Sequence, residues 1–147
     1  VISRTGKRFG CNMISAITNQ GHLNFLVFKD CFQADVLLEF LHRLVRQYSQ
    51  KIFLIVDRHP VHRSKKVKSW LALHLDQIEL FFLPGYSPEL NPDELLNQDV
   101  KSNTIRKYRP NNQDDMLKSV RSFLRKRQRQ PHIVERYFLG KYVRYAA

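Results

Sequence analysis

Residues 51–57 read KIFLIVD, and a continuous apolar run of this length is typical of a β-strand that is buried on both faces. A second run of this kind, QIELFFLP at residues 77–84, is stopped by its terminal proline. Between the two runs, Ser64 can cap a helix that extends to about His74. A strand, a helix and a second strand in this order predict two neighbouring strands joined by a helical crossover.

The residues before this unit predict a hairpin and a helix. Residues 11–28, CNMISAITNQGHLNFLVF, contain two β-rich runs around the turn Asn19-Gln20-Gly21, with glycine where a positive φ is needed. Residues 33–48 then place apolar side chains at helical spacing. These apolar residues are Leu37, Leu38, Leu41, Leu44, Val45 and Tyr48.

The residues after the second run predict further helices. Asn91 is expected to cap a helix that has Pro92 in its first turn. Two more helices are expected at about 112–128 and 131–144, and Met116, Leu117, Val120, Phe123 and Leu124 form the apolar face of the first. The complete order predicts an α/β fold with one mixed sheet flanked by helices.

Composition narrows the class of protein. The 147 residues are enough for one domain, and 43% hydrophobic residues are enough for a core. The longest pure apolar run, IFLIV, is too short to span a bilayer, and the first ten residues have no apolar signal core. Cys11 and Cys31 fit no metal-binding or redox spacing, which indicates packing cysteines in a reducing compartment.

Positive charge is concentrated at the C-terminal end. The net charge is +12, and residues 101–147 hold thirteen Lys and Arg against three acids, whereas residues 51–100 hold six against seven. A basic arm beside a nearly neutral, acid-containing centre favours a polyanionic partner such as DNA. The alternative is a solvated basic surface without a partner.

Two carboxylates are candidates for a site. Asp57 follows the strand run KIFLIV, at the end of a strand where open α/β sheets bind ligands, although it could instead cap the following turn. Glu94 follows the stiff turn PGYSPELNP. Its alternative role is purely structural, because Asn91 and Glu94 have the spacing of a capping box at the start of a helix. Asp93 is expected to complement the helix dipole. If the two strands are neighbours, Asp57 and Glu94 emerge at the same end of the sheet and could bind Mg²⁺ or Mn²⁺.

Two stretches, LIVDRHPVHRSKKVKSWL at 54–71 and LPGYSPELNPDELLNQDVK at 83–101, resemble the DDE transposases of the mariner superfamily, in particular their bacterial insertion-sequence branch. The segment SPELNPDE and the 36 residues between Asp57 and Glu94 are specific to that pattern. The resemblance covers nearly the whole chain, including the ending IVERYFLGKYVRYAA. It implies an RNase H-like fold and a bacterial, cytoplasmic, nucleoid-associated protein.

The resemblance also implies roles. Asp57 and Glu94 match the second and third acids of the catalytic triad, with Mg²⁺ or Mn²⁺ as cofactor. We expect the first acid, its strand and the helix-turn-helix region that reads transposon ends to lie upstream of this chain. Asp30 and Asp35 do not substitute for that first acid. The family has Asn after its second acid, where Arg58 stands here, so Arg58 would either compete with the cation or hold a phosphate.

Other residues near Asp57 have weaker signals. Asp57, His59 and His62 could belong to a zinc site, but further ligands at suitable spacing are missing. His62 matches a histidine of the family motif and is expected to line the site. Ser64 is a helix cap rather than a nucleophile, and Trp70 is expected in the core with Val67 and Leu71. The basic segments HRSKKVK and RSFLRKRQRQ are either solvated faces or phosphate contacts.

The resemblance therefore implies part of a transposase catalytic domain, and we expect its core at 1–108 and a basic helical extension of the same domain at 109–147. The chemistry that the resemblance implies is metal-dependent cleavage and strand transfer at insertion-sequence ends. The expected partners are transposon-end and target DNA and a possible second copy of the chain, with no membrane. Alternatives are a remnant that only binds DNA and another RNase H-like nuclease. The DNA-contacting residues are predicted to be Arg58, His62, Arg63, Lys65, Lys66, Arg121, Arg125, Lys126 and Arg127.

Overall fold

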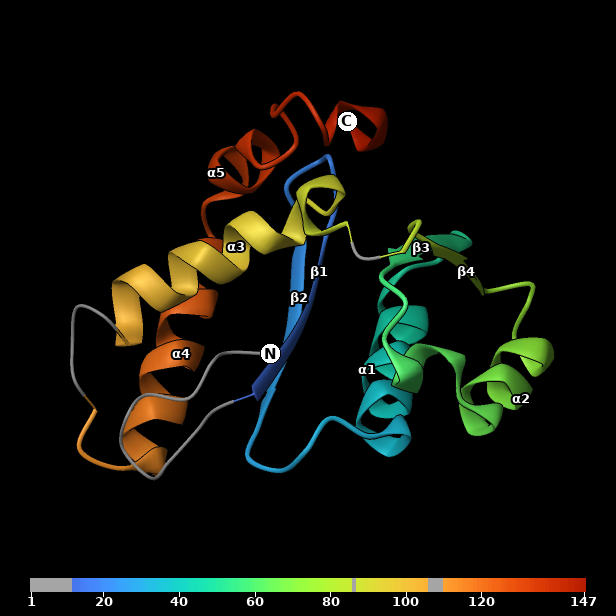
Figure 1. Ribbon diagram of the computed structural model, residues 1–147, viewed down its shortest axis with the longest axis horizontal. Coiled ribbons are helices and arrows are strands. Elements are labelled where there is room, and N and C mark those ends of the chain that lie inside the picture. Colours follow the sequence, from blue (N-terminus) through green and yellow to red (C-terminus); the bar gives the residue numbers. More distant parts are fainter. Residues whose placement is uncertain (1–11, 86, 106–109) are drawn as a thin grey trace. The chain divides into compact units, whose positions relative to one another are not determined.

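A computed structural model describes residues 12–85, 87–105 and 110–147 (Figure 1). The order of strands and longer helices is the one expected from sequence. These elements are β1 (Asn12–Ile17), β2 (Leu23–Phe28), α1 (Ala34–Gln47), β3 (Ile52–Val56), α2 (Lys65–Leu73), β4 (Ile78–Phe82), α3 (Asp93–Val100), α4 (Gln113–Gln128) and α5 (Pro131–Arg136). Short helical turns lie at Pro60–Arg63, Pro88–Leu90, Lys101–Ile105 and Arg144–Ala146.

The chain forms two compact units. The first comprises residues 1–31 and 92–147, and the second comprises residues 32–91. Both residues of the expected boundary, 108 and 109, lie outside the described ranges. None of the described helices is long and apolar enough to cross a membrane.

The first unit begins with the predicted hairpin, which is confirmed over its described residues; Cys11 lies outside them. β1 and β2 pair antiparallel, from Asn12 with Phe28 to Ile17 with Leu23. Gly21, in the turn, has φ +89°, a conformation that side-chain-bearing residues rarely adopt. A Cβ at this position would also lie 2.6 Å from Pro131 Cβ, so the turn requires glycine for two independent reasons.

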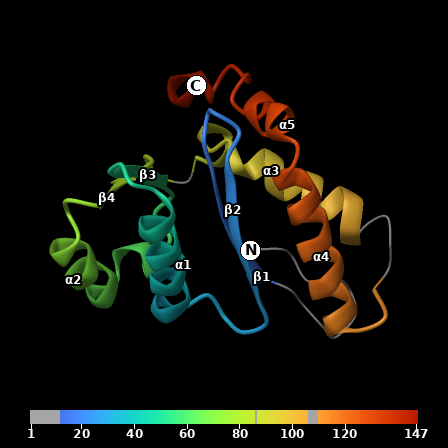
Figure 2. The same ribbon diagram turned by 180° about the vertical axis from the view of Figure 1, so that it is seen from behind.

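One face of the hairpin and the surrounding helices enclose the core of the first unit (Figure 2). α3 contacts β1, and α4 contacts β2 and α5. The helices supply apolar side chains at intervals of three or four residues, as buried faces require. The core residues are Met13, Leu23, Val27, Leu96, Val100, Met116, Leu117, Val120, Leu124, Val134, Tyr137 and Phe138.

The second unit contains the predicted strand–helix–strand crossover. β3 and β4 pair parallel, from Ile52 with Ile78 to Val56 with Phe82. The ladder continues past the strands, because the Leu83 N–H donates to the Val56 carbonyl at 2.8 Å. Both strands therefore end together. On α1, the predicted amphipathic helix, the residues Leu37, Phe40, Leu41 and Leu44 are buried.

The prediction that the strand at 51–57 is buried on both faces is wrong. Phe53 is 63% exposed and Ile55 is 42% exposed. Within the described residues β3 pairs with β4 alone and β1 pairs with β2 alone, so each unit contains a two-stranded sheet. Because side chains alternate along a strand, Val56 is buried while the other face of β3 stays exposed. Phe81 on β4 is exposed as well.

Three local predictions also change. α3 begins at Asp93 with Pro92, not Asn91, in the capping position. α5 ends at Arg136 rather than near residue 144, because the chain then turns through i to i+3 hydrogen bonds around Gly140. Trp70 is only partly buried: its Nε1–H donates to His42 Nε2 at 3.1 Å. This indole therefore fastens α2 to α1 at the surface of the second unit.

Candidate active site

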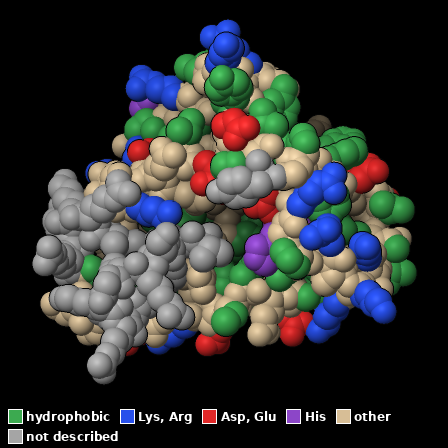
Figure 3. Space-filling model, in the orientation of Figure 1, with side chains coloured by type: hydrophobic (Ala, Val, Ile, Leu, Met, Phe, Trp, Pro, Cys, Tyr) green, Lys and Arg blue, Asp and Glu red, His purple; other side chains and the backbone are tan. Residues whose placement is uncertain are grey.

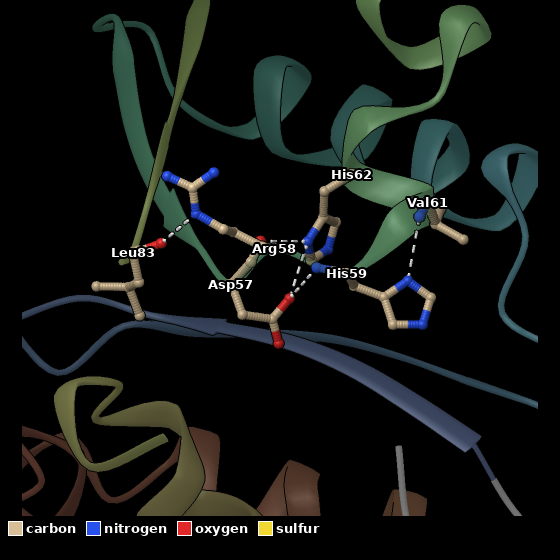
Figure 4. Close-up of polar contacts among 6 residues, drawn as sticks. All are labelled: Asp57, Arg58, His59, Val61, His62 and Leu83. Carbon is tan, nitrogen blue, oxygen red and sulfur yellow. Dashed lines mark hydrogen bonds and ion pairs between the residues drawn. The ribbon is translucent and has the colours of Figure 1, made fainter. Parts of the chain in front are cut away.

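Asp57 follows the last residue of β3 (Figure 4). Its Oδ1 atom accepts a hydrogen bond from the His59 N–H at 3.0 Å. His62 Nδ1 lies 3.1 Å from the same Oδ1 and 3.0 Å from the Asp57 carbonyl oxygen. Both neighbours are acceptors, so Nδ1 of His62 carries the proton and donates it to Asp57. The carboxylate is thus oriented by a turn N–H and an imidazole.

These hydrogen bonds keep Asp57 ionised. The His62 hydrogen bond, opposed by partial burial and aided by the His59 N–H, lowers the pKa of the Asp57 carboxyl to about 2. The side chain remains 57% exposed, whereas that of His62 is 11% exposed. The exposed Asp57 carboxylate is therefore hydrogen-bonded to the buried His62 imidazole. This arrangement is expected for a carboxylate that binds a cation or accepts a further hydrogen bond.

The two carboxylate oxygens of Asp57 differ in their hydrogen bonding. Oδ1 accepts both hydrogen bonds, and Oδ2 accepts none from the residues that the structure describes. Figure 4 shows Oδ2 directed away from His59 and His62. The residue thus combines a fixed orientation with an open oxygen, which is how supporting hydrogen bonds typically hold a metal-ligating carboxylate.

His59 has a different role from His62. The Val61 N–H donates to His59 Nδ1 at 3.1 Å, so this nitrogen is unprotonated and caps the turn that follows. Burial lowers the pKa of His59, which keeps the ring neutral. Phe32 packs edge-on against both rings, at 5.2 Å from His59 and 5.8 Å from His62. A hydrogen bond and ring packing therefore both stabilise the turn after β3.

The structure gives no support to the zinc hypothesis. No group of three or more His, Cys, Asp or Glu side chains within the described ranges is arranged to hold a metal ion. His59 uses Nδ1 and His62 uses Nδ1 in the contacts described above. These histidines thus shape the turn and orient Asp57.

Arg58 points away from the Asp57 carboxylate. Its Nε–H donates to the Leu83 carbonyl at 3.0 Å, and Figure 4 shows the guanidinium turned toward β4 while the Asp57 carboxylate lies on the histidine side. Arg58 thereby ties the end of β3 to the end of β4. The Arg58 side chain braces the strand ends. Its other guanidinium N–H groups donate to none of the described residues and could hold an anion such as phosphate.

Glu94 lies in the first turn of α3, in the first unit. Its neighbour Asp93 accepts from the Ser15 hydroxyl at 2.7 and 2.8 Å, which fastens the start of α3 to β1. The half-buried Glu94 carboxylate makes no hydrogen bond or ion pair with the residues described, so it does not form the alternative capping box. Ser15 was not identified from sequence, because 78 residues separate it from Asp93.

The basic residues after Asp57 lie on the surface. Ser64 caps α2 as expected, accepting from the Val67 N–H at 3.4 Å. Arg63 and Lys65 are exposed, and Lys66 forms an ion pair with Asp35. Figure 3 shows Lys and Arg side chains gathered over α2. The Arg and Lys side chains of the segment HRSKKVK therefore form an exposed basic surface of the second unit, whereas its His62 and Val67 are buried.

The basic residues predicted on the C-terminal helix divide into two kinds. Arg121, Arg125 and Lys126 are exposed on α4. Arg127 has a side chain only 12% exposed and lies 3.6 Å from Asp99 Oδ2. The first three are available to a partner, whereas Arg127 is engaged within the first unit.

Comparisons with known proteins agree with the motif. Residues 1–117 match the protein family described as DDE superfamily endonuclease. The chain is also 31% identical over 91 residues to the Insertion element IS630 uncharacterized 39 kDa protein of Shigella sonnei. That alignment covers 60% of this chain and 26% of the relative, so the chain spans about a quarter of the relative's length. Both matches confirm the resemblance to DDE enzymes of bacterial insertion sequences.

Proposed function

This chain belongs to the DDE superfamily endonucleases, and on that premise we propose that it is part of the catalytic domain of a DNA transposase. Its reaction is metal-dependent cleavage of DNA at the ends of an insertion sequence, followed by strand transfer. The observation that carries the proposal is Asp57: an ionised carboxylate at the end of a strand, oriented through one oxygen and open at the other.

The residues present fit a divalent cation. Asp57 and Glu94 are hard oxygen donors of the kind that Mg²⁺ and Mn²⁺ prefer, and each carboxylate has at least one oxygen without a partner among the described residues. The resemblance to the family motif, including the 36 intervening residues, assigns the two as ligands of one catalytic centre. An RNase H-like fold is part of the same proposal.

The chain's own residues prepare the ligand. His62 donates to Asp57 and keeps the carboxylate ionised and fixed in direction. His59 fixes the turn, and Arg58 holds the strand ends together through Leu83. In the first unit, the Ser15–Asp93 contact fixes the start of the helix that carries Glu94. Such supporting contacts limit the motion of catalytic groups.

The proposed chemistry has two steps. When bound, divalent cations lower the pKa of water and stabilise the charge that develops on the leaving oxygen. In the first step water attacks the phosphorus at the element's end, the P–O3′ bond breaks, and the 3′ oxygen leaves as a hydroxyl. In the second step this 3′-hydroxyl attacks a phosphodiester of the target strand, and the target's own 3′ oxygen leaves with a proton.

DNA contact is proposed for the exposed basic surfaces of both units. In the second unit these residues are Arg58, Arg63, Lys65 and Lys66, with His62 lining the site. In the first unit they lie on α4. A second candidate function, DNA binding without cleavage, is favoured by the charge of residues 101–147, where thirteen Lys and Arg face three acids.

A plasmid assay distinguishes the two functions. We expect a protein that combines this chain with the first acid of the triad to nick supercoiled plasmid in the presence of Mn²⁺, and to join labelled DNA with a free 3′-hydroxyl to it. Asp57→Ala and Glu94→Ala should abolish both products. Asp76→Ala and Glu89→Ala, which remove exposed acids outside the proposed site, should not. DNA binding without nicking at any Mn²⁺ concentration would establish the second function, and nicking without joining would indicate another type of nuclease.

A further inference from the structure

One side of α4 carries a stripe of exposed cations. Lys118, Arg121, Arg125 and Arg129 follow one another at intervals of three or four residues, so they share one side of the helix and its C-terminal cap. The opposite side is buried in the core of the first unit, which fixes the rotation of the helix about its axis. The stripe is therefore directed outward by the fold of the unit.

These cations line a groove of about 670 Å³ on the surface of the first unit. Lys29, which follows β2 directly, adds a fifth cation from a different element. Ser122 contributes a hydroxyl, and the buried Leu117 forms part of the lining. Asp114 is the single carboxylate among the described residues that line the groove. Five cations against one anion make the groove complementary to a polyanion.

Most of the cationic donors in the groove are available. Among the residues described, the side chains of Lys118, Arg125 and Arg129 form no hydrogen bond or ion pair. Arg121 donates from one Nη to the Val27 carbonyl at 3.3 Å, which leaves its other N–H groups for an external acceptor. The stripe therefore consists of unneutralised charges beside one another, an arrangement that repels itself unless an anion is bound.

Asp114 occupies the end of the groove near Lys29. The carboxylate lies 2.8 Å from Lys29 Nζ, and this hydrogen bond lowers the pKa of Asp114. Both side chains are more than half exposed. Asp114 thus neutralises one of the five cations and would repel an anion that approached this end.

Arg127, in contrast, is a cation of α4 whose side chain is engaged by contacts within the first unit. Its position continues the buried side of α4 after Val120 and Phe123, and its guanidinium lies 4.8 Å from the Phe123 ring centre. Its Nη1–H donates to Gln130 Oε1 at 3.1 Å, and Nη2 lies 3.6 Å from Asp99 Oδ2. Arg127 therefore stabilises the first unit and does not line the groove.

We propose that this groove, formed by α4 and the end of β2, binds the phosphodiester backbone of DNA. The eleven helical steps from Lys118 to Arg129 extend about 16 Å along the helix. The backbone of a DNA strand carries one negative charge per nucleotide, so a stripe of this length can contact more than one successive phosphate. A small phosphate compound would engage only one or two of the cations, and contacts of this kind position DNA without reading its sequence.

The inference rests on the proposed function in taking DNA as the partner. It deepens that function by adding Lys29, Lys118 and Arg129 to the contact surface and by leaving out Arg127. Its test is independent of cleavage because binding is measured without metal. The assay uses the full chain, fluorescent duplex DNA, EDTA, and salt concentrations from about 50 to 200 mM.

We expect Arg125→Ala and Arg129→Ala each to weaken DNA binding by roughly tenfold at about 0.1 M salt, and each to reduce the slope of log affinity against log salt by about 0.9. Lys141→Ala removes an equal charge from an exposed position of the first unit outside the groove and should change affinity by less than about twofold. Arg125→Lys should restore most of the loss. Equal effects at positions 125, 129 and 141 would overturn the groove in favour of diffuse attraction.

Asp114→Asn should tighten DNA binding several-fold, and an unchanged or weaker affinity would contradict the proposal. Polyglutamate is the competitor that tests the ligand: it should displace DNA poorly, and equal competition per charge would overturn the assignment to a phosphodiester backbone. If the unmodified chain binds DNA through the groove but does not cleave it, the proposed function alone fails. If DNA is cleaved while Arg125→Ala and Arg129→Ala leave DNA binding unchanged, the groove alone fails.

Discussion

His62 Nδ1 lies 3.1 Å from Asp57 Oδ1, so a buried imidazole directs an exposed carboxylate at the end of β3. The same Nδ1 lies 3.0 Å from the Asp57 carbonyl oxygen, which fixes the ring relative to the backbone of the residue it orients. Asp57 therefore has both a defined direction and a low pKa before any cation arrives. This pairing links the local turn to the proposed chemistry.

The first prediction concerns the acidity of Asp57. Replacing His62 by alanine removes the hydrogen bond that contributes most to the low pKa, so the pKa of Asp57 should rise from about 2 toward 3.8. Carboxyl ¹³C NMR titration measures this change. His74→Ala removes another imidazole of the same unit that does not contact Asp57 and should leave the value near 2. An unchanged pKa in His62→Ala would show that the His62 contact is unimportant.

The same shift predicts a pH dependence of stability. A carboxyl whose pKa is lower in the folded state stabilises the fold above its unfolded pKa of about 3.8, and this contribution is lost as the pH falls through about 2. We expect Asp57→Asn to show a smaller loss of unfolding free energy between about pH 5 and pH 2 than the unmodified chain. Urea titrations at several pH values in this range measure the free energy of unfolding of both proteins. The same pH dependence in Asp57→Asn and in the unmodified chain would contradict a stabilising contact at Asp57.

Another prediction concerns the contact between Ser15 and Asp93. Ser15→Ala leaves the half-buried Asp93 carboxylate without its 2.7 Å hydrogen bond, and the free energy of unfolding should fall by about 1–2 kcal/mol. Ser102→Ala, at an exposed position of the same unit, should change stability by less than about 0.5 kcal/mol. Urea unfolding decides between a contact that fastens α3 and one that contributes nothing.

A further prediction concerns the hairpin turn. Gly21→Ala must adopt φ +89° and place its Cβ 2.6 Å from Pro131, so it should cost at least about 2 kcal/mol of stability. Gly85→Ala is the matched control, because Gly85 has φ +30° but a Cβ added there would meet no atom within 4 Å. It should cost about 1 kcal/mol. Equal losses would mean that backbone strain alone matters at Gly21.

The environment of Tyr137 predicts how the stability of the chain changes at alkaline pH. Burial, together with donation of its O–H to Asp99, raises the pKa of Tyr137 above 10. A raised pKa leaves stability unaffected below about pH 10 and reduces it as the pH rises from there toward the folded pKa, by about 1 kcal/mol per pH unit. Tyr137→Phe should show a shallower decline in urea unfolding between about pH 9 and 11. Tyr142→Phe, at a 59% exposed position, should decline as the unmodified chain does.

The sequence predicted the parts of the fold that local patterns determine. The apolar runs at β3 and β4, the periodicity of α1 and the cap at Ser64 identified the crossover correctly, because each signal depends on neighbouring residues. The exposure of Phe53 and Ile55 was not predicted, because it depends on what covers the sheet rather than on the strand itself.

The site shows the same division. Asp57 was placed at the end of its strand, but the direction of Arg58 depends on the Leu83 carbonyl 25 residues away, which no local pattern encodes. Ser15 and Asp93 meet across 78 residues for the same reason. Arg127 was different: its four-residue spacing from Phe123 already indicated the buried side of α4, and a helical projection would have separated it from Arg125.

The most direct test of the central claim is a Mn²⁺ titration followed by electron paramagnetic resonance of the free ion. We predict that the chain binds Mn²⁺ and that Asp57→Ala and Glu94→Ala each weaken binding at least about tenfold, a change of about 1.4 kcal/mol. Asp76→Ala and Glu89→Ala should bind as the unmodified chain does. Superimposable titration curves for all five proteins would contradict the assignment of Asp57 and Glu94 as metal ligands.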